Sequence, residues 1–171
     1  TEDVLQKSVV SAVLAALEAA LGGFEQNAVL RYLRSVLSPL DPDTCDRVEN
    51  YAILWGVRGA VWHKAWENHP DGLGENWTES AQKRLAQLND ARIRALQPLK
   101  DLSDAFRSAE NVARQVEAIY AFLEELQLAR QLDRLARQLD ESGDNRSAQI
   151  LDQLWEILLM ALEQLHGVLG R

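Results

Sequence analysis

The chain is 171 residues long and 47% of its residues are hydrophobic, which is enough to form one domain, or one large subdomain, with a buried core. Its net charge of -8 argues against strong autonomous nucleic-acid binding, since dedicated domains of that kind normally carry a basic excess that neutralises phosphates. The single cysteine, Cys45, excludes an internal disulfide and a metal cluster held by this chain's cysteines alone.

Three short helices are predicted within residues 1–55. An apolar stripe over residues 3–21 predicts the first, and a glycine pair ends it because glycine tolerates the left-handed cap conformation. A second stripe predicts a helix over residues 25–37, which a proline ends. Asp41 and Pro42 predict the start of the third helix, because aspartate caps free amides and proline suits the first helical position.

Residues 56–77 are predicted to form an irregular loop rich in glycine and tryptophan. A loop of this length is uncommon unless it is functional or held by its own side chains. Trp62, Trp66 and Trp77 are expected to hold it against the helices, with Trp62 as a structural residue.

Residues 78–171 are predicted to form long helices. Thr78 is expected to cap a helix that runs to about Phe106 and is kinked or split at Pro98. Ser108 is expected to cap another helix, which runs to about Asp140.

A final helix carries a leucine stripe over residues 151–169, with Trp155 in the middle as a core anchor. Docking of this stripe onto a neighbouring domain is the alternative to a core role. No β-strand is evident. The predicted fold is therefore all-α: a single irregular multi-helix bundle that ends in a long antiparallel helical hairpin.

Three short segments, residues 32–34, 48–51 and 56–62, follow one another in a fixed order as Tyr-Leu-Arg, Val-Glu-Asn-Tyr and Gly-Val-Arg-Gly-Ala-Val-Trp. Together they resemble the AddB subunit of bacterial ATP-dependent helicase/deoxyribonucleases. That family carries an aromatic-Leu-Lys/Arg segment, a Leu/Val-Glu-Asn-Tyr segment and a Gly-Ile/Val-Arg-Gly-x-x-Trp segment. The match extends over about residues 24–66, and the remainder agrees only as a Leu- and Gln-rich helical tract.

The resemblance implies a helical accessory subdomain of a superfamily-1 helicase-like fold. Its parent complex would contain an AddA-like motor and nuclease subunit, and would resect broken DNA ends in recombinational repair. ATP, magnesium and a 4Fe-4S cluster would belong to other parts of that complex, and DNA would be reached through it. Because the chain begins at Thr1 and its only methionine is Met160, an internal fragment of a longer protein is expected.

The candidate DNA contacts are basic side chains within one acidic chain. The stretch between residues 79 and 100 is locally basic, and basic helical faces can follow a nucleic-acid backbone. A solvated face with i,i+4 ion pairs is the more usual meaning of such a stretch. The candidates are Lys83, Arg84, Arg92, Arg94, Lys100 and, outside the stretch, Arg58.

Glu49 and Tyr51 are expected to be structural residues. Their spacing prevents them from sharing one helix face, so Tyr51 is expected to pack while Glu49 or its neighbour bonds the following loop. Arg58 is the expected partner of Glu49, because a guanidinium fork fits a carboxylate. The alternative for Arg58 is contact with a DNA phosphate.

Other functions have less support in the sequence. A helical protein–protein interaction module unrelated to nucleic-acid processing is the alternative to the AddB-like subdomain. An independent enzyme is disfavoured, since no Walker phosphate loop and no converging acid, base or nucleophile is present. A metal site at His63, His69 and Asp71 matches no known ligand spacing, so no metal is expected. Without a signal peptide or a long apolar span, the cytoplasm is expected and a membrane is not.

Overall fold

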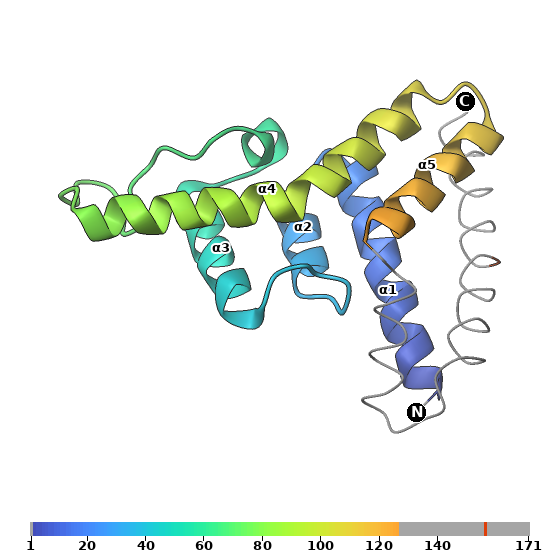
Figure 1. Cartoon of the computed structure of the whole chain (residues 1–171), viewed down its shortest axis with the longest axis horizontal. Helices are drawn as coiled ribbons and strands as arrows, with labels where there is room; N and C mark the ends of the chain where they lie inside the picture. Colours follow the sequence, from blue (N-terminus) through green and yellow to red (C-terminus); the bar gives the residue numbers. More distant parts are fainter. Residues whose placement is uncertain (1, 127–155, 157–171) are drawn as a thin grey trace.

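The computed structural model describes residues 2–126 and 156, and the part of the chain up to residue 126 is built from helices (Figure 1). No strand occurs among these residues, which confirms the predicted all-α class for this part of the chain. In chain order the elements are α1 (Glu2–Leu21), α2 (Gln26–Leu33), α3 (Pro42–Trp55), the 3-10 helix η1 (Gly59–His63), α4 (Glu79–Ser108) and α5 (Val112–Glu125).

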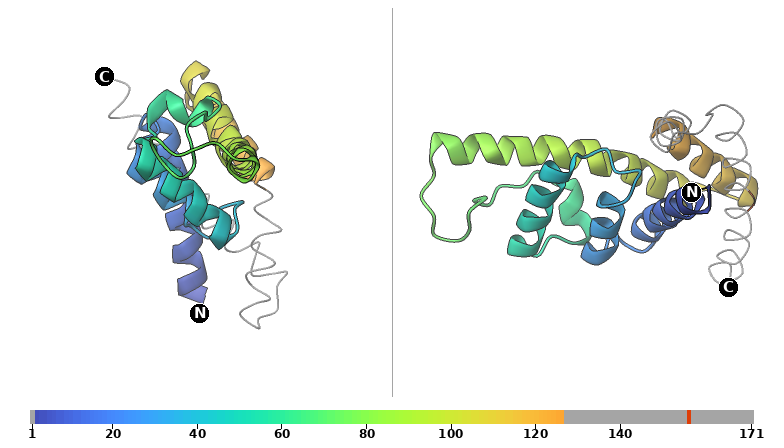
Figure 2. Two further views of the ribbon diagram at one scale, coloured as in Figure 1. Left: turned by 90° about the vertical axis from the view of Figure 1, so that its left-hand side faces the viewer. Right: turned by 90° about the horizontal axis from the view of Figure 1, so that it is seen from below.

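Helix α4 is the central helix of the structure, and it packs against α1, α3, α5 and η1. Helix α2 packs against both α1 and α3. The loop between η1 and α4 lies at the opposite end of α4 from α1 and α5, as the views in Figures 1 and 2 agree. Helix α3 and the first half of α4 lie beside this loop and can therefore form a site with it.

Local signals set both ends of α3. The Asp41 carboxylate accepts a hydrogen bond from the Thr44 N–H at 2.8 Å, and Pro42 occupies the first turn. At the other end Gly56 takes φ 60°, and its N–H donates to the Ala52 carbonyl. The predicted start of this helix is confirmed.

Pro98 lies inside α4, which changes direction in its second half but is not split, one of the two outcomes expected for this helix (Figure 1). The boundaries of the other helices differ from the prediction in two places. Helix α2 ends at Leu33 instead of continuing to residue 37. The expected cap at Ser108 is wrong: α4 continues through it, and Asn111 caps α5 by accepting the Arg114 N–H at 3.0 Å.

Helix α5 ends at Glu125, and the predicted helix over residues 127–140 lies outside the described residues. The second arm of the predicted hairpin and Trp155 lie outside the described residues. Within the described part, no helix combines the length and apolar character needed to cross a membrane.

Candidate functional site

The loop over residues 56–78 is held by aromatic packing. Trp62 is fully buried, and the Trp66 ring stacks on the Tyr51 ring with 4.5 Å between centroids. The Tyr51 hydroxyl also accepts the Asn68 N–H at 3.1 Å. Trp77, in contrast, is 48% exposed and contacts the His69 ring. Tyr51 and Trp62 are thus packed in the core, and two of the three loop tryptophans, Trp62 and Trp66, are buried.

Helix α4 fastens this loop through polar side chains. The Asn89 amide oxygen accepts the Trp66 N–H at 2.8 Å, and its amide nitrogen donates to the Trp66 carbonyl at 2.9 Å. Arg92 donates to the Asn89 oxygen at 3.1 Å and to the Trp62 carbonyl at 3.3 Å. We name this arrangement of Asn89 and Arg92 on the loop backbone the loop clasp. Sequence reasoning did not single out Asn89, and an asparagine inside a helix carries no signal that reveals such a role.

The clasp separates Arg92 from the other candidate DNA contacts. Its side chain is buried, and this burial lowers the pKa of the guanidinium from its ordinary value. Lys100 is half-buried and pairs with Asp104 at 2.8 Å, while Lys83 is exposed. Arg58 is exposed and directly precedes η1, so it does not belong to the basic stretch on α4. The linear basic stretch therefore does not form one surface.

The expected pair between Glu49 and Arg58 is wrong, because the Glu49 carboxylate pairs with Arg34. Arg34 follows α2 directly, so this ion pair joins the end of α2 to α3. Glu49 thus acts between two helices, and the loop is held to the end of α3 by a different side chain. Gln26 donates to the carbonyls of Ala52 and Val57 at 2.8 and 3.2 Å.

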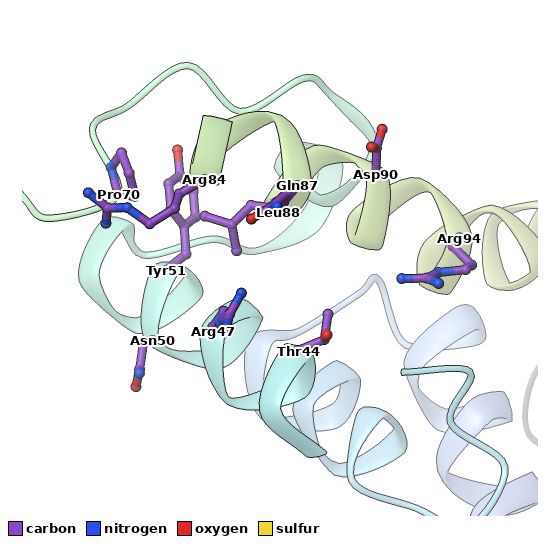
Figure 3. A pocket seen from close by; sticks show the side chains of 10 residues that line it. All are labelled: Thr44, Arg47, Asn50, Tyr51, Pro70, Arg84, Gln87, Leu88, Asp90 and Arg94. Atoms are coloured by element: carbon purple, nitrogen blue, oxygen red, sulfur yellow. The ribbon is translucent and has the colours of Figure 1, made fainter. Parts of the chain in front are cut away.

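A groove of about 640 Å³ lies between α3 and α4 and is the site that the basic side chains share (Figure 3). Arg47 comes from α3, whereas Arg84 and Arg94 come from α4. In Figure 3 the Arg47 side chain reaches toward α4 and the Arg94 side chain extends along the same gap. The residues that line the groove are Thr44, Arg47, Asn50, Tyr51, Pro70, Arg84, Gln87, Leu88, Asp90 and Arg94.

The three arginines of the groove differ in their partners. Arg84 holds Asp71 with two hydrogen bonds of 2.6 and 2.8 Å, and these bonds keep the pKa of the Asp71 carboxyl below its usual value. Arg47 pairs with Asp43 at 2.7 Å on the same helix. The Arg94 side chain is exposed and makes no ion pair or hydrogen bond in the described part of the chain. The groove therefore offers one unpaired cation and two cations held by exposed carboxylates.

The three residues of the candidate metal site do not all converge, since His69 and Asp71 are neighbours but His63 lies elsewhere. The His63 ring lies edge-on to Phe24, whereas the His69 ring contacts Trp77. The Asp71 N–H donates to His69 Nδ1 at 3.0 Å, so Nε2 carries the proton that binds the Asn76 carbonyl. Both His69 nitrogens are thus used by the loop itself. Among the described residues, no three His, Cys, Asp or Glu side chains are grouped to hold a metal ion.

No protein-family model matches the chain. Curated proteins named as the AddB subunit of an ATP-dependent helicase/deoxyribonuclease do match it. The protein from Clostridium botulinum (strain Langeland) is 26% identical over 170 residues, which cover 98% of this chain and 15% of that protein. Those from Desulforamulus reducens and Anoxybacillus flavithermus are each 28% identical, over 98% and 99% of this chain and 15% and 16% of theirs.

The chain thus spans about 15% of the length of the curated relatives that it matches. The similarity also extends well beyond the three short segments that first indicated it, since it covers 98% of the chain. The resemblance to the AddB subunit of the ATP-dependent helicase/deoxyribonucleases is thereby confirmed, at 23–28% identity.

Proposed function

We propose that this chain is a non-catalytic helical subdomain of an AddB-like helicase/nuclease subunit that acts in the resection of double-strand breaks for recombinational repair. The observation that carries the proposal is the match of nearly the whole chain to one part of proteins named as a subunit of such an enzyme. In this role the chain shapes the path of the DNA and braces an AddA-like motor subunit. ATP, magnesium and the iron-sulfur cluster belong to other parts of the complex.

The packing of the resembling segments supports a scaffold role. Tyr32, Tyr51 and Trp62 are all buried, and the last two hold the loop. Side chains that are buried in this way maintain the fold and are not available to contact a substrate. The groove between α3 and α4 is therefore the surface in this region that remains available for contact with a ligand.

The test uses the full-length subunit assembled with its motor partner. Replacing Asn89 with alanine detaches the loop from α4 and should lower the rate of degradation of linear double-stranded DNA. Gln97→Ala is the matched control, since within the described residues the Gln97 amide bonds only Asp101, on the exposed side of the same helix. A detached loop with an unchanged degradation rate would contradict the proposal.

A second candidate function is a protein–protein interaction module, and exposed apolar side chains favour it. Leu73 is 90% exposed, and Leu54 and Trp77 are each about half exposed. If docking is the main role, Leu73→Ser should weaken binding of a partner protein while leaving DNA degradation by the assembled enzyme unchanged. The open reading frame also discriminates, because the AddB-like proposal requires a protein several times longer than this chain.

A further inference from the structure

We propose that the groove between α3 and α4 binds the phosphodiester backbone of a single-stranded nucleic acid, with Arg47, Arg84 and Arg94 as its phosphate ligands. The anion site is argued from the three guanidinium groups, which line the groove beside one carboxylate, Asp90. The choice of a nucleic acid as the source of the anion rests on the proposed function.

The geometry supports an anion site because cations from two helices share one cavity. Arg47 extends from α3 toward α4, and Arg94 extends from α4 along the gap between them (Figure 3). Thr44, Asn50, Gln87 and the carboxylate Asp90 also line the groove, and Figure 3 draws Asn50 and Asp90 turned away from the Arg47 side chain. The planar guanidinium fork matches the oxygens of a phosphate group, so the side chains nearest the gap suit this ligand.

The groove also has apolar walls, which suit a polymer better than a free ion. Tyr51, Pro70 and Leu88 line it between the arginines. A single strand presents sugar and base surfaces beside its phosphates, and proteins bind such strands by combining a cationic track with apolar contacts. The two hydrogen bonds from Arg84 to Asp71, the residue after Pro70, tie this part of the loop to α4.

Two of the three arginines are paired with exposed carboxylates that a phosphate group can replace. Asp43 and Asp71 already pair with Arg47 and Arg84, at 2.7 and 2.6 Å. Because exposed ion pairs contribute little to stability, a phosphate can replace either carboxylate with a small net change. Arg94 has no such competitor among the described residues, so it is the first contact available. Together with the net charge of -8, this makes binding weak and strongly dependent on salt.

The experiment is a titration of the 171-residue chain with a fluorescein-labelled oligothymidylate of about 15 nucleotides, followed by anisotropy at several salt concentrations. Arg47→Ala and Arg94→Ala should each weaken binding several-fold and reduce the slope of log K against log salt by about 0.7. Asp43→Asn should tighten binding instead, because it releases Arg47. Unchanged thermal unfolding of each variant shows that the fold is kept.

Helix α5 supplies a matched control. Arg114 pairs with Glu117 at 2.8 Å and is as exposed as Arg47, but it lies far from the groove in sequence and on another helix. Arg114→Ala and Glu117→Gln change the net charge by the same amounts as the groove variants. These two control variants should alter binding much less than the groove variants. Their effect measures the contribution of net charge alone, which can then be subtracted from that of the groove variants.

The outcomes distinguish the groove from its alternatives. Equal effects of the Arg47 and Arg114 substitutions, or no binding by the parent chain at low salt, would overturn the groove. An oligoglutamate peptide that displaces the oligonucleotide at a lower molar concentration would overturn the nucleic acid as the ligand, in favour of an acidic protein segment. None of these results bears on the degradation assay with Asn89→Ala, which judges the proposed function separately.

Discussion

The loop clasp makes a quantitative prediction for Asn89→Ala. The side chain of Asn89 satisfies both the N–H and the carbonyl of Trp66, at 2.8 and 2.9 Å, and the Trp66 residue is only 4% exposed. A buried backbone group that loses its partner costs about 1–3 kcal/mol, and two such groups with partial access to water should cost about 2–4 kcal/mol. This is a large part of the roughly 5–15 kcal/mol by which a domain is stable.

The measurement is urea unfolding followed by tryptophan fluorescence, with the free energy of unfolding extrapolated to water. Gln97→Ala removes an exposed hydrogen bond of 2.8 Å from the same helix and should stay within about 0.5 kcal/mol of the parent. If Asn89→Ala also stays within about 0.5 kcal/mol, then water replaces the amide at Trp66 and the clasp does not hold the loop.

Three further predictions concern single substitutions and activity. Arg92→Ala should lower the free energy of unfolding by about 1–3 kcal/mol, because it removes two donors from a buried position, whereas Arg94→Ala should leave it nearly unchanged in the same urea titration. The hydrogen bonds from Thr44 lower the pKa of Asp41, so the stabilisation is present above about pH 4 and is lost as the pH falls through the lowered value. Asp41→Ala should therefore reduce the melting temperature more at neutral pH than at acidic pH, as a pair of thermal scans will show. The isolated chain should neither hydrolyse ATP nor cut DNA, and magnesium-dependent ATPase activity that rises in proportion to protein concentration would refute this.

The parts of the fold that depend only on residues close together in the sequence were predictable. Asp41, Pro42 and Gly56 mark the ends of α3 because a cap is decided within one helical turn. The choice between Ser108 and Asn111 was not predictable on the same basis, since both residue types cap helices. In the structure the Ser108 hydroxyl donates to the Asp104 carbonyl at 2.9 Å, so it bonds backward within α4 and is not available to cap α5.

The candidate site needed information that sequence spacing does not carry. Arg92 and Arg94 are two positions apart, so they project from nearly opposite sides of α4, and only one of them meets the loop. Arg47 was not singled out because it is the only cation in α3, among several acidic residues. It becomes part of a basic groove only because α3 packs beside α4, a contact between segments separated by a long loop.

The ion pairs of Arg47 with Asp43 and of Arg84 with Asp71 explain why a groove that binds DNA weakly suits the proposed role. A strand that moves through an enzyme must break each phosphate contact at every step, so a tightly binding site would slow it. At two of the three arginines, a departing phosphate does not leave a bare cation, because Asp43 and Asp71 can pair with Arg47 and Arg84 again. One exposed ion pair replaces another, and the free-energy difference between the two states is small. Removing either carboxylate should therefore tighten binding to the chain yet slow DNA movement in an assembled enzyme, a combination that a merely electrostatic surface would not produce.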